Sequence, residues 1–259
     1  MNRIDYLFQT KKERVLSIYV TAGFPNLEDT LPVMEAIQAA GADIIELGIP
    51  YSDPIADGPT IQESNTQALE NGMSIKTLFS QLVGFRSKIH VPVILMGYLN
   101  PIIQFGVEEF CKKCKEVGVD GLILPDLPMS QYLEEYKNLF DEYGLYISFL
   151  ISPQTSEKRI REVDENSSGF IYMVSSHAIT GAKAGISKEQ EDYFKRVAGM
   201  NLNHPRLIGF GISDAATFQL ASRYSQGAII GSAFIKHISN STALMQDIQT
   251  FIQGVLAKE

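Results

Sequence analysis

Short β-rich runs alternate with helical patterns about eight times along this chain of 259 residues. Parallel strands joined by helices produce such an alternation, because each crossover between parallel strands needs a connecting segment of helical length. The expected strands cover Leu16–Val20, Asp43–Leu47, Val93–Tyr98, Gly121–Leu124, Tyr146–Ile151, Phe170–Val174, Arg206–Gly209 and Ala228–Ile230. The expected helices include Leu27–Ala40, Ile75–Lys88, Gln131–Tyr143, Glu157–Asn166, Lys188–Ala198, Asp214–Tyr224 and Ser232–Leu256.

This pattern predicts an α/β fold, a single (β/α)8 TIM barrel over residues 1–259 with an extra N-terminal helix. An open doubly wound sheet would satisfy the same alternation, but no Gly-x-Gly-x-x-Gly follows the first expected strand. The chain length and the 45% hydrophobic content suffice for one sizeable core. No Pro/Gly-rich linker divides the sequence, so one catalytic domain is expected.

The net charge limits the classes of partner that this chain can bind. A net charge of −8 and a pI near 5.1, without any stripe of Lys and Arg, argue against a nucleic-acid partner. The sequence has no apolar run approaching the length of a membrane span, and its N-terminus lacks the apolar core of a signal peptide. We therefore expect a cytoplasmic protein with no membrane partner.

Cys111 and Cys114 form the one C-x-x-C pair of the sequence. The pair lies within residues 107–117, whose periodicity is that of an amphipathic helix. A zinc site needs four ligands and a redox pair needs a helix N-terminus, so two half-buried helix positions are the simpler interpretation.

The chemistry is expected at the C-terminal ends of the strands, where barrels of this kind build their sites. Glu46 lies at the end of an apolar strand, where an unpaired charge is costly or is driven to take up a proton. Asp57 and Asp53 follow in the next loop, and two carboxyls in different surroundings can serve opposite roles. Asp before Pro or Gly also forms ordinary turns, which is the favoured interpretation for Asp53. Asp126, at another strand end, is expected to be structural.

Two glycine turns predict a phosphate site. Residues 209–213 and 231–233 follow the last two strands and each leads into a helix, where backbone N–H groups can approach an anion. Ordinary tight turns are the alternative, but barrels often bind phosphate at this position. No strand end carries a lysine for a Schiff base. The histidines His90, His204 and His237 fall away from the strand ends, which favours acid–base chemistry without a metal.

The stretch from Ile44 to Gln62, read as IIELGIPYSDPIADGPTIQ, closely resembles the signature of the tryptophan synthase alpha chain family. Supporting matches lie at both glycine turns and in the segment 175–185, which resembles the family's mobile lid. Thr180 and Gly181 match the lid pattern, whereas Ala178 stands where a glycine is usual. His177 is therefore not expected to be catalytic. A solvated loop without a role is the alternative for this segment.

The resemblance implies retro-aldol cleavage of indole-3-glycerol phosphate to indole and glyceraldehyde 3-phosphate. Glu46 would protonate indole C3 as general acid and then act as general base, and Asp57 would stabilise positive charge at the ring N–H. The implied indole-binding residues are Tyr19, Ile61, Met96, Ile123, Tyr172, Thr180, Phe210 and Ile229. The implied phosphate-binding residues are Gly181, Gly211, Gly231 and Ser232.

The resemblance also implies no cofactor of the chain's own. Pyridoxal phosphate is expected only in a partner beta chain, within an alpha2-beta2 heterotetramer whose interface would include residues 52–60 and 98–104. Three alternatives stay open: another phosphate-binding barrel such as a sugar-phosphate isomerase or epimerase, a subunit that mainly activates its partner, and a stand-alone lyase that releases free indole.

Overall fold

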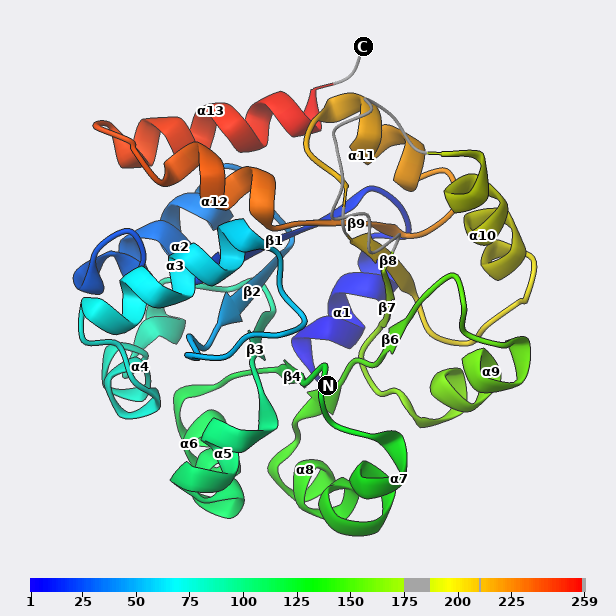
Figure 1. Ribbon diagram of the computed structural model, residues 1–259, viewed down its shortest axis with the longest axis horizontal. Helices are drawn as coiled ribbons and strands as arrows, with labels where there is room; N and C mark the ends of the chain where they lie inside the picture. Colours follow the sequence, from blue (N-terminus) through cyan, green and yellow to red (C-terminus); the bar gives the residue numbers. More distant parts are fainter. Residues whose placement is uncertain (175–186, 210, 258–259) are drawn as a thin grey trace.

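The computed structural model describes residues 1–174, 187–209 and 211–257, and within these ranges every strand pairing is parallel (Figure 1). The strands are β1 (Val15–Thr21), β2 (Ile44–Gly48), β3 (Val93–Met96), β4 (Gly121–Ile123), β5 (Tyr146–Ile147), β6 (Leu150–Ile151), β7 (Ile171–Val174), β8 (Arg206–Gly209) and β9 (Gly227–Ile230). They form one sheet in the order β5-β4-β3-β2-β1-β9-β8-β7-β6.

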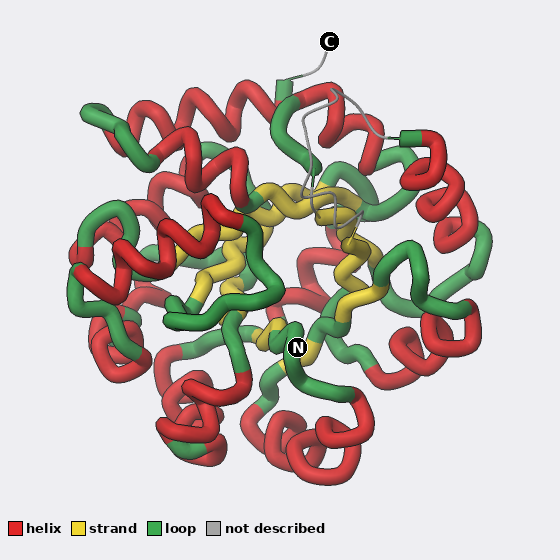
Figure 2. The backbone as a smooth tube through the Cα atoms, in the orientation of Figure 1, coloured by secondary structure: helices red, strands yellow, loops and turns green. Residues whose placement is uncertain are grey.

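The two outer strands of that order are halves of one chain segment. Only Ser148 and Phe149 separate β5 from β6, and they bridge the neighbouring strands. The Ser148 N–H donates to the Leu122 carbonyl at 3.1 Å, and the Phe149 carbonyl accepts from the Tyr172 N–H at 2.9 Å. The sheet therefore closes on itself through residues 146–151, and the predicted barrel is confirmed. Figure 2 shows the strands curving within an outer layer of helices.

The helices surround this sheet. They are α1 (Arg3–Thr10), α2 (Thr30–Ala39), α3 (Pro59–Glu70), α4 (Ile75–Gln81), α5 (Leu99–Phe105), α6 (Val107–Val117), α7 (Met129–Gln131), α8 (Lys137–Tyr143), α9 (Glu157–Asn166), α10 (Lys188–Ala198), α11 (Ala215–Ala221), α12 (Ser232–Ile238) and α13 (Leu244–Leu256), with 3-10 turns η1 (Leu27–Asp29) and η2 (Phe85–Ser87) and a π-helical turn η3 (Tyr132–Tyr136). No helix in the described part of the chain is both long and apolar enough to cross a membrane.

Two expected helices are wrong as single elements. Ile75–Lys88 ends as an α-helix at Gln81, and after Gly84, whose φ is +74°, it continues only as the 3-10 turn η2. The stretch Ser232–Leu256 divides into α12 and α13 because residues 239–243 are rich in side chains that compete for backbone hydrogen bonds. The Ser241 hydroxyl accepts from the Ala243 N–H at 3.1 Å and donates to Asp247 at 2.5 Å. These hydrogen bonds end the first helix and fix the start of α13.

Alternation along the strands divides the apolar residues into two layers. Residues such as Ile18, Leu47 and Ile230 face outward and pack under the helices. Their neighbours face inward, where Ile44, Ile94, Ile123, Phe170, Tyr172, Leu207 and Ile229 form a separate cluster inside the barrel. The inward positions are therefore the ones that can line a site at the barrel mouth.

Helix α1 covers the N-terminal end of the barrel. Ile4 is 1% exposed and belongs to the interior cluster. Arg3 forms an ion pair with Asp120, which directly precedes β4, at 2.9 Å, and the Asn2 amide donates to the Asp120 carbonyl at 2.8 Å. With this end closed, access to the interior is left to the opposite end, where the strands have their carboxyl termini.

Candidate active site

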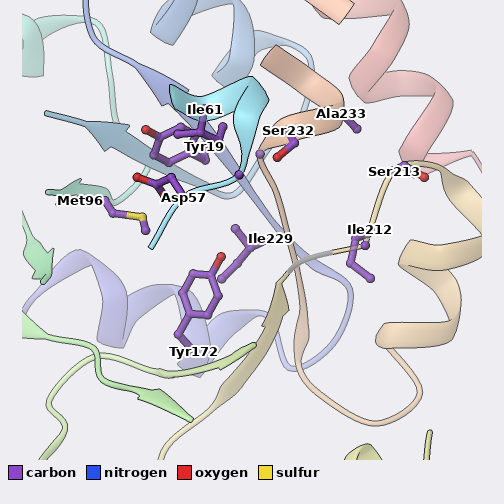
Figure 3. A pocket seen from close by; sticks show the side chains of 13 residues that line it. Tyr19, Asp57, Ile61, Met96, Tyr172, Ile212, Ser213, Ile229, Ser232 and Ala233 are labelled. Atoms are coloured by element: carbon purple, nitrogen blue, oxygen red, sulfur yellow. The ribbon is translucent and has the colours of Figure 1, made fainter. Parts of the chain in front are cut away.

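Inward-facing residues of several strands meet in a cavity of about 280 Å³ at the C-terminal end of the barrel (Figure 3). Pockets of roughly this size take small metabolites. The lining residues are Tyr19, Asp57, Gly58, Ile61, Met96, Tyr172, Gly211, Ile212, Ser213, Ile229, Gly231, Ser232 and Ala233. One side is apolar and aromatic, and the other consists of glycine and small polar residues.

Glu46 is fully buried inside β2. Its Oε1 accepts a hydrogen bond from the Ser17 hydroxyl at 2.7 Å, and its Oε2 accepts none from any described residue. Burial raises the pKa of Glu46 to about 8, and the Ser17 hydrogen bond opposes that rise only in part. Glu46 is thus a carboxyl that holds its proton at neutral pH and has one oxygen uncommitted.

The structure corrects the expected position of Glu46. It lies two residues before the end of β2 rather than at the end, and it is not among the residues that line the cavity. Register pairs it with Tyr19 across the β1–β2 ladder. Its charge contributes to the raised pKa values of Tyr19 and Tyr172, both of which do line the cavity. Glu46 therefore lies just beneath the cavity wall, with its side chain turned to Ser17.

Asp57 is half-buried and reaches the cavity from the loop after β2. Its Oδ2 accepts from the Tyr98 hydroxyl at 3.0 Å, and the Tyr98 oxygen accepts from the Ala56 N–H at 3.0 Å. Burial raises the pKa of Asp57, while the Tyr98 hydrogen bond lowers it. The carboxylate is thus held in a fixed direction by a donor that favours its ionised form.

Two close approaches require glycine at the barrel mouth. A Cβ on Gly48 would clash with the Tyr19 hydroxyl, and one on Gly209 would clash with the Tyr172 hydroxyl. Each tyrosine therefore lies across the end of a neighbouring strand, which brings both rings into the cavity wall. Burial raises the pKa of both phenols, so both stay protonated.

The opposite side of the cavity is formed by the two glycine turns. Gly211 has a φ of +79°, a conformation that favours glycine. Gly231, Ser232 and Ala233 form the start of α12, whose first N–H groups have no partner within the helix. The two turns line the same cavity, so both can offer backbone donors to one anion.

The structure gathers many of the expected residues and leaves others aside. In the cavity wall lie Tyr19, Asp57, Ile61, Met96, Tyr172, Ile229, Gly211, Gly231 and Ser232. Ile123 is not among the lining residues, and its side chain is fully buried in the interior cluster. The expected site residues Thr180, Gly181 and Phe210, and the lid with His177 and Ala178, lie outside the described residues.

Sequence reasoning missed several lining residues. Ile212, Ser213 and Ala233 lie within the two predicted glycine turns but were not singled out, and Gly58, which also lines the cavity, directly follows Asp57. Tyr98 is expected only at a strand end and in the interface segment 98–104, and nothing local links it to Asp57, which lies 41 positions away.

The remaining carboxyls have structural partners. Both oxygens of Asp126 accept from the Leu99 N–H at 3.0 Å and so hold the start of α5, in line with the structural role expected for it. Asp53 is exposed and accepts from the Ser52 hydroxyl at 2.5 Å. Cys111 and Cys114 are buried on α6, and burial raises the pKa of both thiols. The described residues contain no group of three or more ligands suited to a metal ion.

The chain is similar to known proteins in its sequence and in its structure. Residues 7–257 match the family model described as tryptophan synthase alpha chain. The tryptophan synthase alpha chain of Flavobacterium johnsoniae is 55% identical over 93% of this chain and 95% of the relative, and that of Christiangramia forsetii is 53% identical over 99% of each. The crystal structure of tryptophan synthase subunit alpha from Legionella pneumophila is 32% identical and superposes with a TM-score of 0.89 over 98% of this chain and 97% of the other. A chain of tryptophan synthase from M. tuberculosis, in its aminoacrylate-bound form, is 26% identical with a TM-score of 0.85 over 98% of both.

Proposed function

The chain belongs to the tryptophan synthase alpha chain family, and from this premise we propose which of its residues carry out the family's reaction. It is a carbon–carbon lyase of tryptophan biosynthesis that cleaves indole-3-glycerol phosphate to indole and glyceraldehyde 3-phosphate. The observation that carries the assignment of residues is one cavity bounded by a carboxylate at its apolar side and by two glycine turns opposite, with a buried carboxylic acid beneath it.

Glu46 is the proposed general acid and base. Indole C3 cannot accept the electrons of the breaking bond until it is protonated, so a proton donor must act first. With a pKa near 8, Glu46 carries a proton at neutral pH, and its Oε2 is engaged by no described residue. The side-chain hydroxyl next to C3 then loses its proton, the C–C bond breaks, and the bonding electrons restore the indole ring. Glu46, ionised by giving its proton to C3, accepts the hydroxyl proton and is protonated again, while the proton on C3 stays with the released indole.

Asp57 is the proposed partner of the ring N–H. Protonation at C3 places positive charge on the indole ring, which a fixed carboxylate at N1 stabilises. The Tyr98 hydroxyl favours the ionised form of Asp57 and fixes its direction. Tyr19, Ile61, Met96, Tyr172 and Ile229 supply the walls that would hold the indole ring.

The phosphate is proposed to lie at the glycine turns. Ser213, Ser232 and Ala233 lie on the side of the cavity away from Asp57 (Figure 3), and Gly211 and Gly231 line the same cavity. Backbone N–H groups can hold a dianion there without a lysine, which suits a chain of net charge −8. Thr180, Gly181 and Phe210 keep the roles that the family resemblance implies for them.

As a tryptophan synthase alpha chain, this protein has a beta chain as its partner. We propose an alpha2-beta2 heterotetramer in which residues 1–259 act as one catalytic domain and pyridoxal phosphate is held by the beta chain alone. The proposed interface includes residues 52–60 and 98–104. Ile55 is 92% exposed and Ile103 is 46% exposed, so apolar side chains are available on both segments for burial by a partner.

Indole release from indole-3-glycerol phosphate by the purified chain, alone and with a cognate beta chain, tests these assignments. Slow cleavage alone and strong acceleration by the partner are expected of an alpha subunit. Brisk cleavage without a partner would instead indicate a stand-alone lyase. No cleavage in either mixture would contradict the proposed roles of Glu46 and Asp57 and favour an activator or an isomerase.

A further inference from the structure

A second, much smaller cavity lies behind Asp57. Its volume is about 10 Å³, and its polar walls are Tyr19, Asp57, Asn65 and Tyr98. Tyr19 and Asp57 also line the main cavity, so Asp57 stands between the two spaces. A space of this size holds about one water molecule, provided that polar groups surround it.

Asn65 has no evident structural reason to be polar. It lies in α3 and is 2% exposed, and its Oδ1 accepts no hydrogen bond from any described residue. A buried carbonyl oxygen without a donor destabilises a fold, and asparagine is also a weak helix former. A leucine of similar shape would serve packing better, so the amide needs another explanation.

The two tyrosines beside this cavity cannot satisfy that oxygen. Tyr98 gives its hydroxyl proton to Asp57 at 3.0 Å. Ser64 donates to the Ile61 carbonyl at 2.9 Å, so it accepts from Thr21 at 2.7 Å, and Thr21 in turn accepts from the Tyr19 hydroxyl at 3.4 Å. Both phenol protons are thereby directed away from Asn65, and a water molecule is the remaining donor.

The Asp57 carboxylate can use the same donor. Among the described residues its side chain accepts only the Tyr98 hydrogen bond, and that bond reaches Oδ2. A carboxylate has acceptor sites on both oxygens, so one donor leaves it under-satisfied in a partly buried position. A water with one hydrogen toward Asn65 has its second hydrogen available for Asp57.

We propose that one ordered water binds in this small cavity, donating to Asn65 Oδ1 and to the Asp57 carboxylate, and that Asn65 is thereby a positioning residue for Asp57. The water fixes the carboxylate from behind while its other side faces the substrate space. Its catalytic meaning rests on the proposed function, in which Asp57 must be ionised to stabilise charge at the indole N–H.

The electrostatic surroundings make a second donor important. The titratable groups that face Asp57 are Tyr98, Tyr19 and Tyr172, with Glu46 beneath them on β2, and none of these is a cation. Burial raises the pKa of Asp57, and Tyr98 is the one described group whose hydrogen bond lowers it. A water donor therefore shifts the balance toward the ionised form.

The variant Asn65→Leu tests this role, because it keeps the shape and removes the oxygen. We expect kcat/KM for indole release at neutral pH to fall about tenfold, because one hydrogen bond to a charged group is lost. The acid limb of the pH profile of kcat/KM should move to higher pH. The melting temperature should change little, because the leucine fills the same space and leaves no buried polar atom of its own without a partner. In an Asp57→Asn background the same change should cause no further loss.

The variant Asn71→Ala is the matched control. Asn71 ends the same helix and donates to the carbonyls of Gly23 and Pro25 at 2.9 Å each. Its loss should lower stability and leave the acid limb in place. An Asn65→Leu enzyme with the wild-type pH profile would overturn the positioning role.

The water itself is tested by a high-resolution crystal structure of the full chain. We expect one solvent peak within about 3.2 Å of both Asn65 Oδ1 and an Asp57 oxygen, absent in Asn65→Leu. No peak in a wild-type protein that cleaves its substrate would overturn the water site and leave the proposed function intact. A peak in a protein that does not cleave indole-3-glycerol phosphate would support the water site and contradict the proposed function.

Discussion

Replacing Glu46 by Gln should stabilise the protein at neutral pH while it abolishes cleavage. Glu46 is fully buried, and among the described residues Ser17 alone donates to it, at 2.7 Å. Burial raises its pKa from 4.5 to about 8. The unfolded chain ionises this carboxyl freely, whereas the folded protein must hold it protonated or bury a charge. A neutral amide of nearly the same shape removes that conflict.

The sign and the size of the effect follow from proton linkage. Because the pKa is higher in the folded state, the folded protein binds more protons between pH 4.5 and about 8, and its stability falls as the pH rises through this window. Each pH unit above 4.5 costs about 1.4 kcal/mol, so the wild type loses about 3 kcal/mol at pH 7. Below pH 4.5 the carboxyl is neutral in both states, and the two proteins should be equally stable.

Urea denaturation of both proteins over a pH series measures this difference. Subtracting the two free energies of unfolding at each pH cancels the other titrating groups and isolates Glu46. Glu63→Gln, at an exposed position of α3, serves as the control and should change stability by less than about 0.5 kcal/mol at every pH. A difference that stays flat from pH 4.5 to 8 would refute the raised pKa. Indole release at the wild-type rate by Glu46→Gln would remove Glu46 from the mechanism.

Three further predictions address the other parts of the site. Asp57→Asn should lower kcat for indole release on the order of 10²–10³-fold, and near-normal turnover in steady-state assays would contradict its charge-stabilising role. Inorganic phosphate should raise the melting temperature of the wild type but not of Ser232→Asp, where a carboxylate would repel the anion. Ser80→Asp, at an exposed position on α4, is the control and should respond like the wild type. An equal rise in all three proteins would place the phosphate site elsewhere. Ile55→Asp should weaken binding of a cognate beta chain in calorimetry, while Val83→Asp, at an apolar residue 74% exposed between α4 and η2, should leave it unchanged. Equal affinities of the two variants would exclude residues 52–60 from the interface.

Much of the fold could be predicted because local signals are strong in this sequence. The bounds of α9, α10 and β8 agree with the expected ones. Both helices begin at a serine that caps the first turn: Ser156 accepts from the Arg159 N–H, and Ser187 forms a capping box with Gln190. The closed barrel is less local, because it depends on residues 146–151 pairing with strands on both sides.

Contacts between distant residues account for what the sequence did not reveal. The alternation in β2 predicts that Glu46 faces inward, but its turn toward Ser17 depends on a side chain 29 positions away. The link from Tyr98 to Asp57 joins the loop after β3 to the loop after β2. Asn65 stands in a helix whose pattern looks ordinary, and only the packed structure shows that its amide oxygen borders a small cavity.

The buried acids of this barrel show how one fold can use carboxyls in two ways. Among the described residues three are buried, namely Glu46, Asp120 and Asp164. Asp120 pairs with Arg3 and Arg86 and accepts from the Val93 N–H, and Asp164 accepts from both backbone and side-chain donors of residues 203–204. These two lie at the N-terminal end of the barrel, and each joins segments distant in the sequence through its several donors. Among the residues that the structure describes, Glu46, near the open end, has one hydroxyl donor and no ion-pair partner, so its pKa rises into the range where it can give and take a proton. The difference in donors, rather than in burial, therefore separates the carboxyl that can perform catalysis from those that hold the fold together.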